Sequence, residues 1–280
     1  MLAYRHLFHA GNFADVLKHV ALLQITHAFC RKDKPFLYLD THAGTGRYDL
    51  SLAWAQKNAE FRDGITRIWG HSDAPAAIAA YLDSVTAENP DRRLRFYPGS
   101  PRLVRRMMRA GDRAVLSELN KDDCAQLAEL FARDRQVHVQ LMDGYQALKA
   151  YLPPPERRAL VLIDSSFDRA GEYARITDAL VQAYKRFATG VFAIWYPLME
   201  PSAVRAFERG IAESGMRKIL KLELSVFPDS WQGGMRGSAM LIVNPPFELD
   251  TTLAPALAWL HGALSTDGAG THGVEWLVGE

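Results

Sequence analysis

The sequence predicts an α/β fold built around a doubly wound, mostly parallel sheet. Short apolar runs rich in β-branched residues alternate with segments of helical periodicity along the chain. This is the pattern of parallel strands that are linked by helices. Near the C-terminal end, residues 218–227 and 238–244 follow each other without an obvious helix between them, which predicts an antiparallel pair.

The predicted elements follow one another as strand–helix steps after a first helix over residues 13–30. The strands are 36–40, 114–118, 137–143, 160–164 and 191–196, the helices after the last four are 122–133, 146–151, 172–187 and 202–214, and residues 274–278 are a candidate final strand. Five such steps and a C-terminal antiparallel hairpin are the order typical of a Rossmann-like class I methyltransferase sheet.

Residues 48–95 interrupt this alternation. Ile65 and Ile68, and then Ile78 and Tyr81, have helical spacing with no strand between them. We therefore expect a helical insertion between the first two sheet strands, within a single domain that spans residues 1–280.

The composition is that of an ordinary globular protein, with 48% hydrophobic and 23% charged residues. The 33 basic and 32 acidic residues nearly cancel, so any nucleic-acid binding must come from local patches. Cys30 and Cys124 have neither metal nor redox spacing, which favours a reducing compartment. No secretion signal or membrane-spanning run is visible in the sequence, and we expect a cytoplasmic protein.

The stretch Leu160–Phe167 is the most informative part of the chain. Four apolar residues lead into Asp164, two serines and Phe167, and ligands bind at the carboxyl ends of parallel strands. There a carboxylate can accept N–H bonds from a planar base while an aromatic ring stacks on it. The alternative is a strand end at which Asp164 caps a turn and Phe167 packs inward.

Polar residues also follow the other predicted strands. Asp40, His42, Gly44 and Gly46 form a turn in which glycine lets the backbone approach a ligand, and a helix N-terminus is expected after it. The turn lacks the third glycine of a dinucleotide fingerprint, because Asp49 occupies that position; this disfavours an NAD-dependent oxidoreductase.

Two further strand ends carry acids. Glu118 is placed to accept the ribose hydroxyls of an adenosine-containing cofactor, and Asp143 with Gly144 to lie near the adenine amine. Each has a simpler alternative, a solvated carboxylate for Glu118 and a common Asp-Gly turn for Asp143. Acids at three strand ends beside a glycine turn favour a shared binding site.

A second segment has the form of an amine-binding motif, Asn244-Pro245-Pro246-Phe247. It follows the last strand of the hairpin, which we place at the sheet's edge and antiparallel. We therefore expect this segment at the end of the sheet opposite the Asp40–Gly46 turn. We interpret it as a rigid turn through which the chain leaves the sheet.

The N-terminal segment is polar and aromatic, with Tyr4, His6, His9, Lys18 and His19. The His6–His9 spacing raises the possibility of a metal site, but no second cluster has ligand spacing, so none is predicted. The segment is either a solvated helix entry or a cover over the cofactor cleft that supplies Lys18 and His19.

Ser100 and Pro101 have the pattern of a helix N-cap and first helical residue. Arginines then recur at i, i+3, i+4 and i+7, which predicts one basic face: Arg102, Arg105, Arg106 and Arg109. Such a face is either simply solvated or a phosphate-contacting surface for RNA.

Taken together, these motifs resemble the RlmJ family of 23S ribosomal RNA adenine-N6 methyltransferases. The resemblance covers essentially the whole chain, including the strings Tyr4–Asn12 and Tyr184–Gly190. It implies S-adenosylmethionine as cofactor, S-adenosylhomocysteine as product, 23S ribosomal RNA as partner before full subunit assembly, no metal or membrane, and a monomer.

The resemblance also implies the roles of individual residues. It assigns S-adenosylmethionine binding to Lys18, His19, His42, Ser100, Glu118, Asp143, Gly144 and Asp164, catalysis to Asp164 with Ser165 and Phe167, and RNA contact to Tyr4. From the glycine turn we expect Gly44 to bind the cofactor as well. The departure lies at Ser165 and Ser166, where the family usually has two prolines, so a restraint on the backbone is lost.

Two other functions stay open on the sequence alone. One is a methyltransferase of the same fold that acts on DNA or a small molecule. The other is an RNA-binding member of the family whose catalysis is weakened, which only Ser165 and Ser166 suggest.

Overall fold

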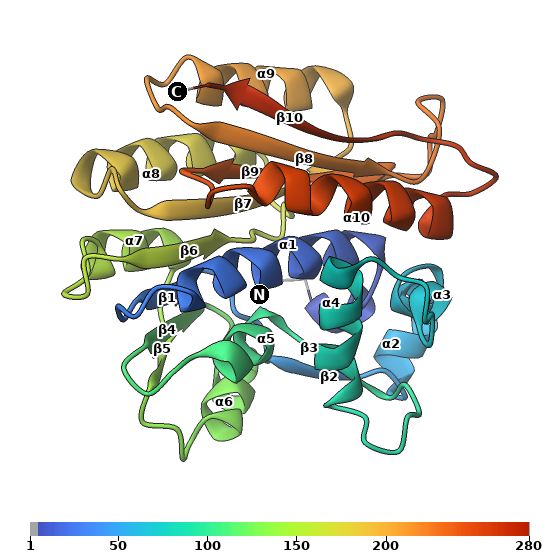
Figure 1. Cartoon of the computed structure of the whole chain (residues 1–280), viewed down its shortest axis with the longest axis horizontal. Helices are drawn as coiled ribbons and strands as arrows, with labels where there is room; N and C mark the ends of the chain where they lie inside the picture. Colours follow the sequence, from blue (N-terminus) through green and yellow to red (C-terminus); the bar gives the residue numbers. More distant parts are fainter. Residues whose placement is uncertain (1–4, 280) are drawn as a thin grey trace.

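The computed structural model describes residues 5–279 and contains one eight-stranded sheet in the order β10-β8-β9-β7-β6-β1-β4-β5, which descends through Figure 1 from top to bottom. Its parallel half consists of β1 (Leu37–Asp40), β4 (Arg113–Glu118), β5 (Val137–Leu141), β6 (Ala159–Ile163) and β7 (Val191–Leu198). All five residues of β6 are buried, as expected for a strand that is covered on both faces. The predicted α/β class is confirmed.

The antiparallel half extends from β7. Strand β9 (Gly237–Val243) pairs with β7 and with β8 (Ile219–Ser225), antiparallel to both, and β10 (His272–Val278) adds the outer edge. The predicted hairpin and final strand are therefore present, but β9 lies inside the sheet rather than at its edge. The sequence analysis also missed α10 (Leu249–Leu264), which packs against β8, β10 and α1.

Helices cover both faces of the sheet. On one face α1 (Phe13–Cys30) packs against α10 and α5 (Ser100–Met107), with α6 (Lys121–Leu130) beside β4 and β5; α1 and α10 run next to each other in Figure 1. The other face carries the helices α7 (Gly144–Tyr151), α8 (Glu172–Arg186) and α9 (Pro201–Ala212). Helix α1 is buried nearly all round, as a helix inside a core is.

The segment between β1 and β4 is mainly helical. It contains α2 (Ala53–Asn58), η2 (Glu60–Asp63), α3 (Ile65–Ile68) and α4 (Ala76–Thr86), and the helix α4 packs on α1 through Ile78, Tyr81 and Val85. The short strands β2 (Arg47–Asp49) and β3 (Phe96–Pro98) pair at its base, and the sequence had not predicted them. η1 (His6–Phe8) precedes α1. None of the helices within residues 5–279 is long and apolar enough to cross a membrane.

Candidate active site

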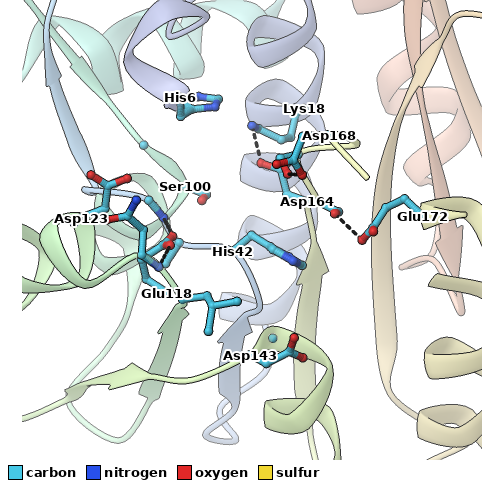
Figure 2. Close-up of a pocket in the computed structure, with 18 of the residues that line it drawn as sticks. His6, Lys18, His42, Ser100, Glu118, Asp123, Asp143, Asp164, Asp168 and Glu172 are labelled. Carbon is cyan, nitrogen blue, oxygen red and sulfur yellow. Dashed lines mark hydrogen bonds and ion pairs between the residues drawn. The ribbon is translucent and has the colours of Figure 1, made fainter. Parts of the chain in front are cut away.

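A pocket lies at the carboxyl ends of β1, β4, β5 and β6, where the parallel strands release their loops. All nine residues that the sequence analysis assigned to cofactor binding line this pocket: Lys18, His19, His42, Gly44, Ser100, Glu118, Asp143, Gly144 and Asp164. Figure 2 shows side chains from α1, from the β1 turn and from the ends of β4, β5 and β6 around one space.

The turn after β1 forms the floor of the pocket through backbone that only glycine fits easily. Gly44 has φ +59°, and a Cβ built on it would lie 2.2 Å from the Tyr48 hydroxyl. Gly144 is similarly enclosed, since its Cβ would lie 2.2 Å from the Thr41 carbonyl oxygen. The expected helix N-terminus after the turn is absent, because β2 follows directly and pairs with β3.

Glu118 links the end of β4 to this turn. Its carboxylate accepts the backbone N–H groups of Gly44 at 2.9 Å and Asn120 at 2.7 Å. Burial raises the pKa of Glu118 above its usual value. The carboxylate is therefore fixed in position at the pocket wall, with lone pairs left for hydroxyl donors.

Asp143 combines a structural and an electrostatic contact. Its side chain caps α7 by accepting the Tyr145 and Gln146 backbone N–H groups, and Arg175 of α8 binds it at 2.6 Å.

His42, in the turn after β1, packs on the helix that Asp143 caps. The His42 ring packs edge-on to Tyr145 with centroids 5.5 Å apart, and burial lowers the pKa of His42.

Asp40 is a fully buried carboxylate behind the turn. It accepts the Tyr38 hydroxyl at 2.6 Å and the Ser100 hydroxyl at 2.7 Å, and burial raises its pKa to about 6. In the structure Ser100 is the first residue of α5, and Gly99 is the N-cap. The prediction that Ser100 is the cap was wrong by one position, because its hydroxyl bonds Asp40 instead.

Lys18 forms the central ion pairs of the pocket. Its Nζ atom lies 2.6 Å from Asp164 Oδ2 and 2.6 Å from Asp15 Oδ1, with 3% of the residue exposed; Figure 2 shows Lys18 and Asp164 pointing at each other. Burial alone would lower the pKa of Lys18, but the two carboxylates outweigh it and raise the pKa above its usual value. On the next position of α1, burial lowers the pKa of His19 to about 3, and its Nδ1 lies 2.8 Å from the Tyr97 hydroxyl.

The segment after β6 departs from its predicted arrangement at one residue. Phe167 has φ +52° and its ring packs on Tyr173 and Trp195 rather than on the pocket. In this structure the ring packs inward, as the alternative for Phe167 had it, and its predicted stacking on a substrate base stays a prediction. Asp164 and Ser165 do line the pocket.

Glu172 anchors this segment and was missed in the sequence. It is 5% exposed at the start of α8, where it accepts the Ser165 hydroxyl at 2.5 Å and the Tyr145 hydroxyl. Acids are common in the first turn of any helix, so no pattern in the sequence indicates this contact. Charged pocket residues that also had no predicted role include Asp123, Asp168, Arg169 and Arg175.

The arginines predicted for RNA contact do not form one free basic face. Arg102 pairs with Glu88, Arg105 with Asp134, and Arg109 with Asp112. Arg109 lies beyond the end of α5 and also donates to the carbonyls of Lys32 and Lys34, so the i+7 position was wrong. Arg106 is exposed. Tyr4 lies outside the described residues.

Asn244–Phe247 lies away from this pocket, as predicted. Asn244 follows β9, which runs antiparallel to β7, and its side chain donates to the Ala188 and Gly190 carbonyls before β7. Its proposed position at the sheet's edge was wrong, since β9 is an inner strand. Within residues 5–279 no cluster of ligating side chains suited to a metal is present.

The sheet order and the pocket at the strand ends define a Rossmann-like α/β protein that binds its ligand where the parallel strands end. Residues 33–278 match the family model described as ribosomal RNA large subunit methyltransferase D, RlmJ. The chain belongs to the RlmJ family. It is 44% identical to proteins named ribosomal RNA large subunit methyltransferase J from Escherichia coli, over 280 residues, and Haemophilus influenzae, over 281 residues, with 100% of both chains covered in each case. A crystal structure of a Legionella pneumophila protein has a TM-score of 0.90 at 34% identity and covers 96% of this chain and 98% of that one.

Family membership makes the chain a methyltransferase that uses S-adenosylmethionine. The pocket fits that group in two respects. Gly44 and Gly144 keep side chains out of the space between the strand ends, and a Cβ on either would collide with neighbouring atoms. Glu118 and Asp143 present fixed carboxylates suited to ribose hydroxyls and to an adenine amine.

Proposed function

We propose that this chain methylates the N6 amine of an adenine in 23S ribosomal RNA, with S-adenosylmethionine as methyl donor. The observation that carries the proposal is the gathering of all nine predicted cofactor residues in one pocket, at whose wall Asp164 ends β6. The full-length relatives named ribosomal RNA large subunit methyltransferase J support the RNA substrate.

The cofactor's adenosine part fits the side of the pocket formed by β4 and β5. Glu118 would accept the ribose hydroxyls, while Asp143 and the backbone at Gly144 would meet the adenine edge. His19, His42 and Ser100 complete the polar wall toward α1 and α5. When bound, S-adenosylmethionine supplies an electrophilic methyl group on its sulfonium.

Asp164 is the residue we assign to the target amine. Its Oδ2 atom is held by Lys18, a pairing that fixes the orientation of the carboxylate. An adenine N6–H that donates to Asp164, and to the Ser165 carbonyl, would have its lone pair turned toward the methyl group, so the rate depends mainly on positioning. Asp164 then takes the proton that the methylated amine releases, directly or by relay.

Ser165 retains part of the restraint that proline gives in the family pattern. The bond from its hydroxyl to Glu172 ties the segment to α8 at a buried site. Phe167 would stack on the base only after its ring leaves Tyr173 and Trp195. Stacking therefore requires the segment after Asp164 to rearrange when the base enters.

The target adenine must leave its helix to reach Asp164, because N6 of a paired and stacked base is inaccessible. This favours RNA that is not yet enclosed in a complete subunit, and hence action before full assembly. A monomer that acts in the cytoplasm remains part of the proposal and has no support of its own in the structure. Tyr4 remains the predicted contact to the RNA.

The test is incubation of the protein with methyl-labelled S-adenosylmethionine and unmodified 23S ribosomal RNA, followed by nucleoside analysis. We expect label in N6-methyladenosine, and none with an Asp164→Ala variant. Label in DNA of the same sequence but not in RNA would contradict the proposal that RNA is the substrate. Cofactor binding without label on either would mean a different substrate or weakened catalysis, and label restored in a Ser165→Pro/Ser166→Pro variant would establish the latter.

A further inference from the structure

A second groove lies at the other end of the parallel sheet, where β6 begins and α1 ends. It is lined by residues 28–29, 31–34, 156–159, 189, 191 and 244–247. Since β6 is five residues long, this groove is separated from the Asp164 pocket by roughly 17 Å of strand. It belongs to none of the machinery described above.

Four cations of the groove are exposed: Arg31, Lys32, Lys34 and Arg157. Within residues 5–279 none of the four forms an ion pair with a carboxylate. The groove's Glu156 binds Arg113 at 2.8 Å, which leaves Asp33 as the acid that faces them. In a chain of net charge +1, this is a local positive surface.

Two more guanidinium groups donate hydrogen bonds to the backbone that carries these cations. Arg158 donates to the Lys34 and Phe29 carbonyls and lies over the Phe29 ring, and Arg109 donates to the Lys32 and Lys34 carbonyls. Burial, and then the nearby charge of Arg109, lower the pKa of Arg158. The segment that carries Lys32 and Lys34 is thus held in place by cations.

Phe247 also lines this groove. Its side chain is 85% exposed, whereas the next most exposed large hydrophobic residue, Leu141, is at 54%. The turn that carries it is fixed, because Asn244 donates to two carbonyls and two prolines follow. A ring presented to solvent by a rigid turn beside unpaired cations is the combination that binds single-stranded nucleic acid.

We propose that this groove, defined by Arg31, Lys32, Lys34, Arg157 and Phe247, binds the backbone and an unpaired base of the substrate RNA at a distance from the methylated adenine. The inference rests on the RNA substrate proposed above. The cations neutralise phosphates, and Phe247 stacks on a base without reading its identity. The groove adds affinity and leaves the chemical step unchanged.

The experiment measures binding of unmodified 23S ribosomal RNA by filter retention without methyl donor, at several salt concentrations. For Lys32→Gln/Lys34→Gln we expect about tenfold weaker binding and a log–log salt slope shallower by roughly one to two. For Phe247→Ala we expect about five- to tenfold weaker binding with an unchanged slope. Arg205→Gln/Arg209→Gln is the matched control, since it removes two exposed charges from α9.

Turnover separates this inference from the proposed function. In the methylation assay, the groove variants should raise KM for RNA with kcat unchanged. Unchanged affinity and salt slope would overturn the proposal, and so would an equal loss in the α9 control, which would indicate a general charge effect. If no variant or wild-type protein methylates RNA, the proposed function fails, but the binding arm still decides whether the groove holds RNA.

Discussion

The two ends of the parallel sheet use charged side chains in opposite ways. At the carboxyl end the charges around Lys18 are buried and bonded to one another, since Lys18 pairs with Asp15 and Asp164. At the amino end, Lys32 and Lys34 face solvent without a carboxylate partner among residues 5–279. Paired buried charges fix a geometry at a high desolvation cost, whereas exposed cations leave their charge available to a polyanion. The first arrangement suits a reaction and the second suits binding.

The largest expected effect comes from breaking the buried pairs with Lys18→Met. Within residues 5–279, removing the cation leaves Asp164 without an ion pair and Asp15 with only His6 and the Gly11 N–H as partners, so we expect the free energy of unfolding to fall by about 3–5 kcal/mol. Methyl transfer should fall at least about 100-fold because Asp164 is no longer oriented. Urea denaturation and labelled-methyl incorporation measure the two effects.

Lys221→Met is the matched control for this variant. Lys221 is also buried and binds Glu208 at 3.0 Å and Glu223 at 2.8 Å, but it lies on β8 away from the pocket. We expect it to lose stability and keep the turnover of its folded fraction. If both lysine variants lose the same turnover, the Lys18–Asp164 pair has no special role.

The pH dependence of stability should differ in sign between the two ends. Asp40 beside the pocket has its pKa raised to about 6 by burial, so the folded state binds more protons than the unfolded state between about pH 4 and pH 6. Its contribution to stability is therefore lost as the pH rises. Relative to Asp40→Asn, we expect wild type to lose of the order of 3 kcal/mol between pH 4 and pH 7.

Asp112, at the amino end of the sheet, should give the opposite dependence of stability on pH. Burial would raise its pKa, but its bonds to Arg109 and to two backbone N–H groups hold the pKa below the usual value. Its contribution to stability is present at neutral pH and is lost as the pH falls. Denaturation of Asp112→Asn and Asp40→Asn from pH 3 to pH 7 tests this; slopes of the same sign would refute the contrast.

The positions of the strands along the chain and those of the carboxylates at their ends were predictable because both depend on local patterns. Buried strands are apolar runs, and Asp164, Glu118 and Asp143 stand where such runs end. By contrast, the Glu172–Ser165 bond joins α8 to a strand end, and nothing in the spacing indicates which hydroxyl an acid will meet. The inner position of β9 was missed for a similar reason, since strand order depends on pairing between distant segments.

A smaller effect is expected at Ser165. Here a side-chain hydrogen bond stands where the family usually has a proline that restrains the backbone. Ser165→Ala removes one of the two hydroxyl donors to buried Glu172, so we expect stability to fall by about 1–3 kcal/mol and kcat to fall several-fold. Ser165→Pro/Ser166→Pro loses the same donor but restrains φ, so kcat should stay within about threefold of wild type. Steady-state kinetics with saturating cofactor decides this, and a large gain in the proline variant would mean that the serines weaken catalysis.

The smallest effect is expected on α5, where the sequence alone placed the RNA-binding arginines. Arg105 is bonded to Asp134 and also to Gln136, so little of its guanidinium is free to bind phosphate. We expect Arg105→Gln to change RNA affinity by less than about twofold and stability by under about 1 kcal/mol. Arg106→Gln is the sharper comparison, because this exposed residue has no ion pair within residues 5–279. If Arg106→Gln weakens RNA binding as much as Lys32→Gln/Lys34→Gln does, the RNA also follows α5, and the contrast between the two ends no longer explains where affinity arises.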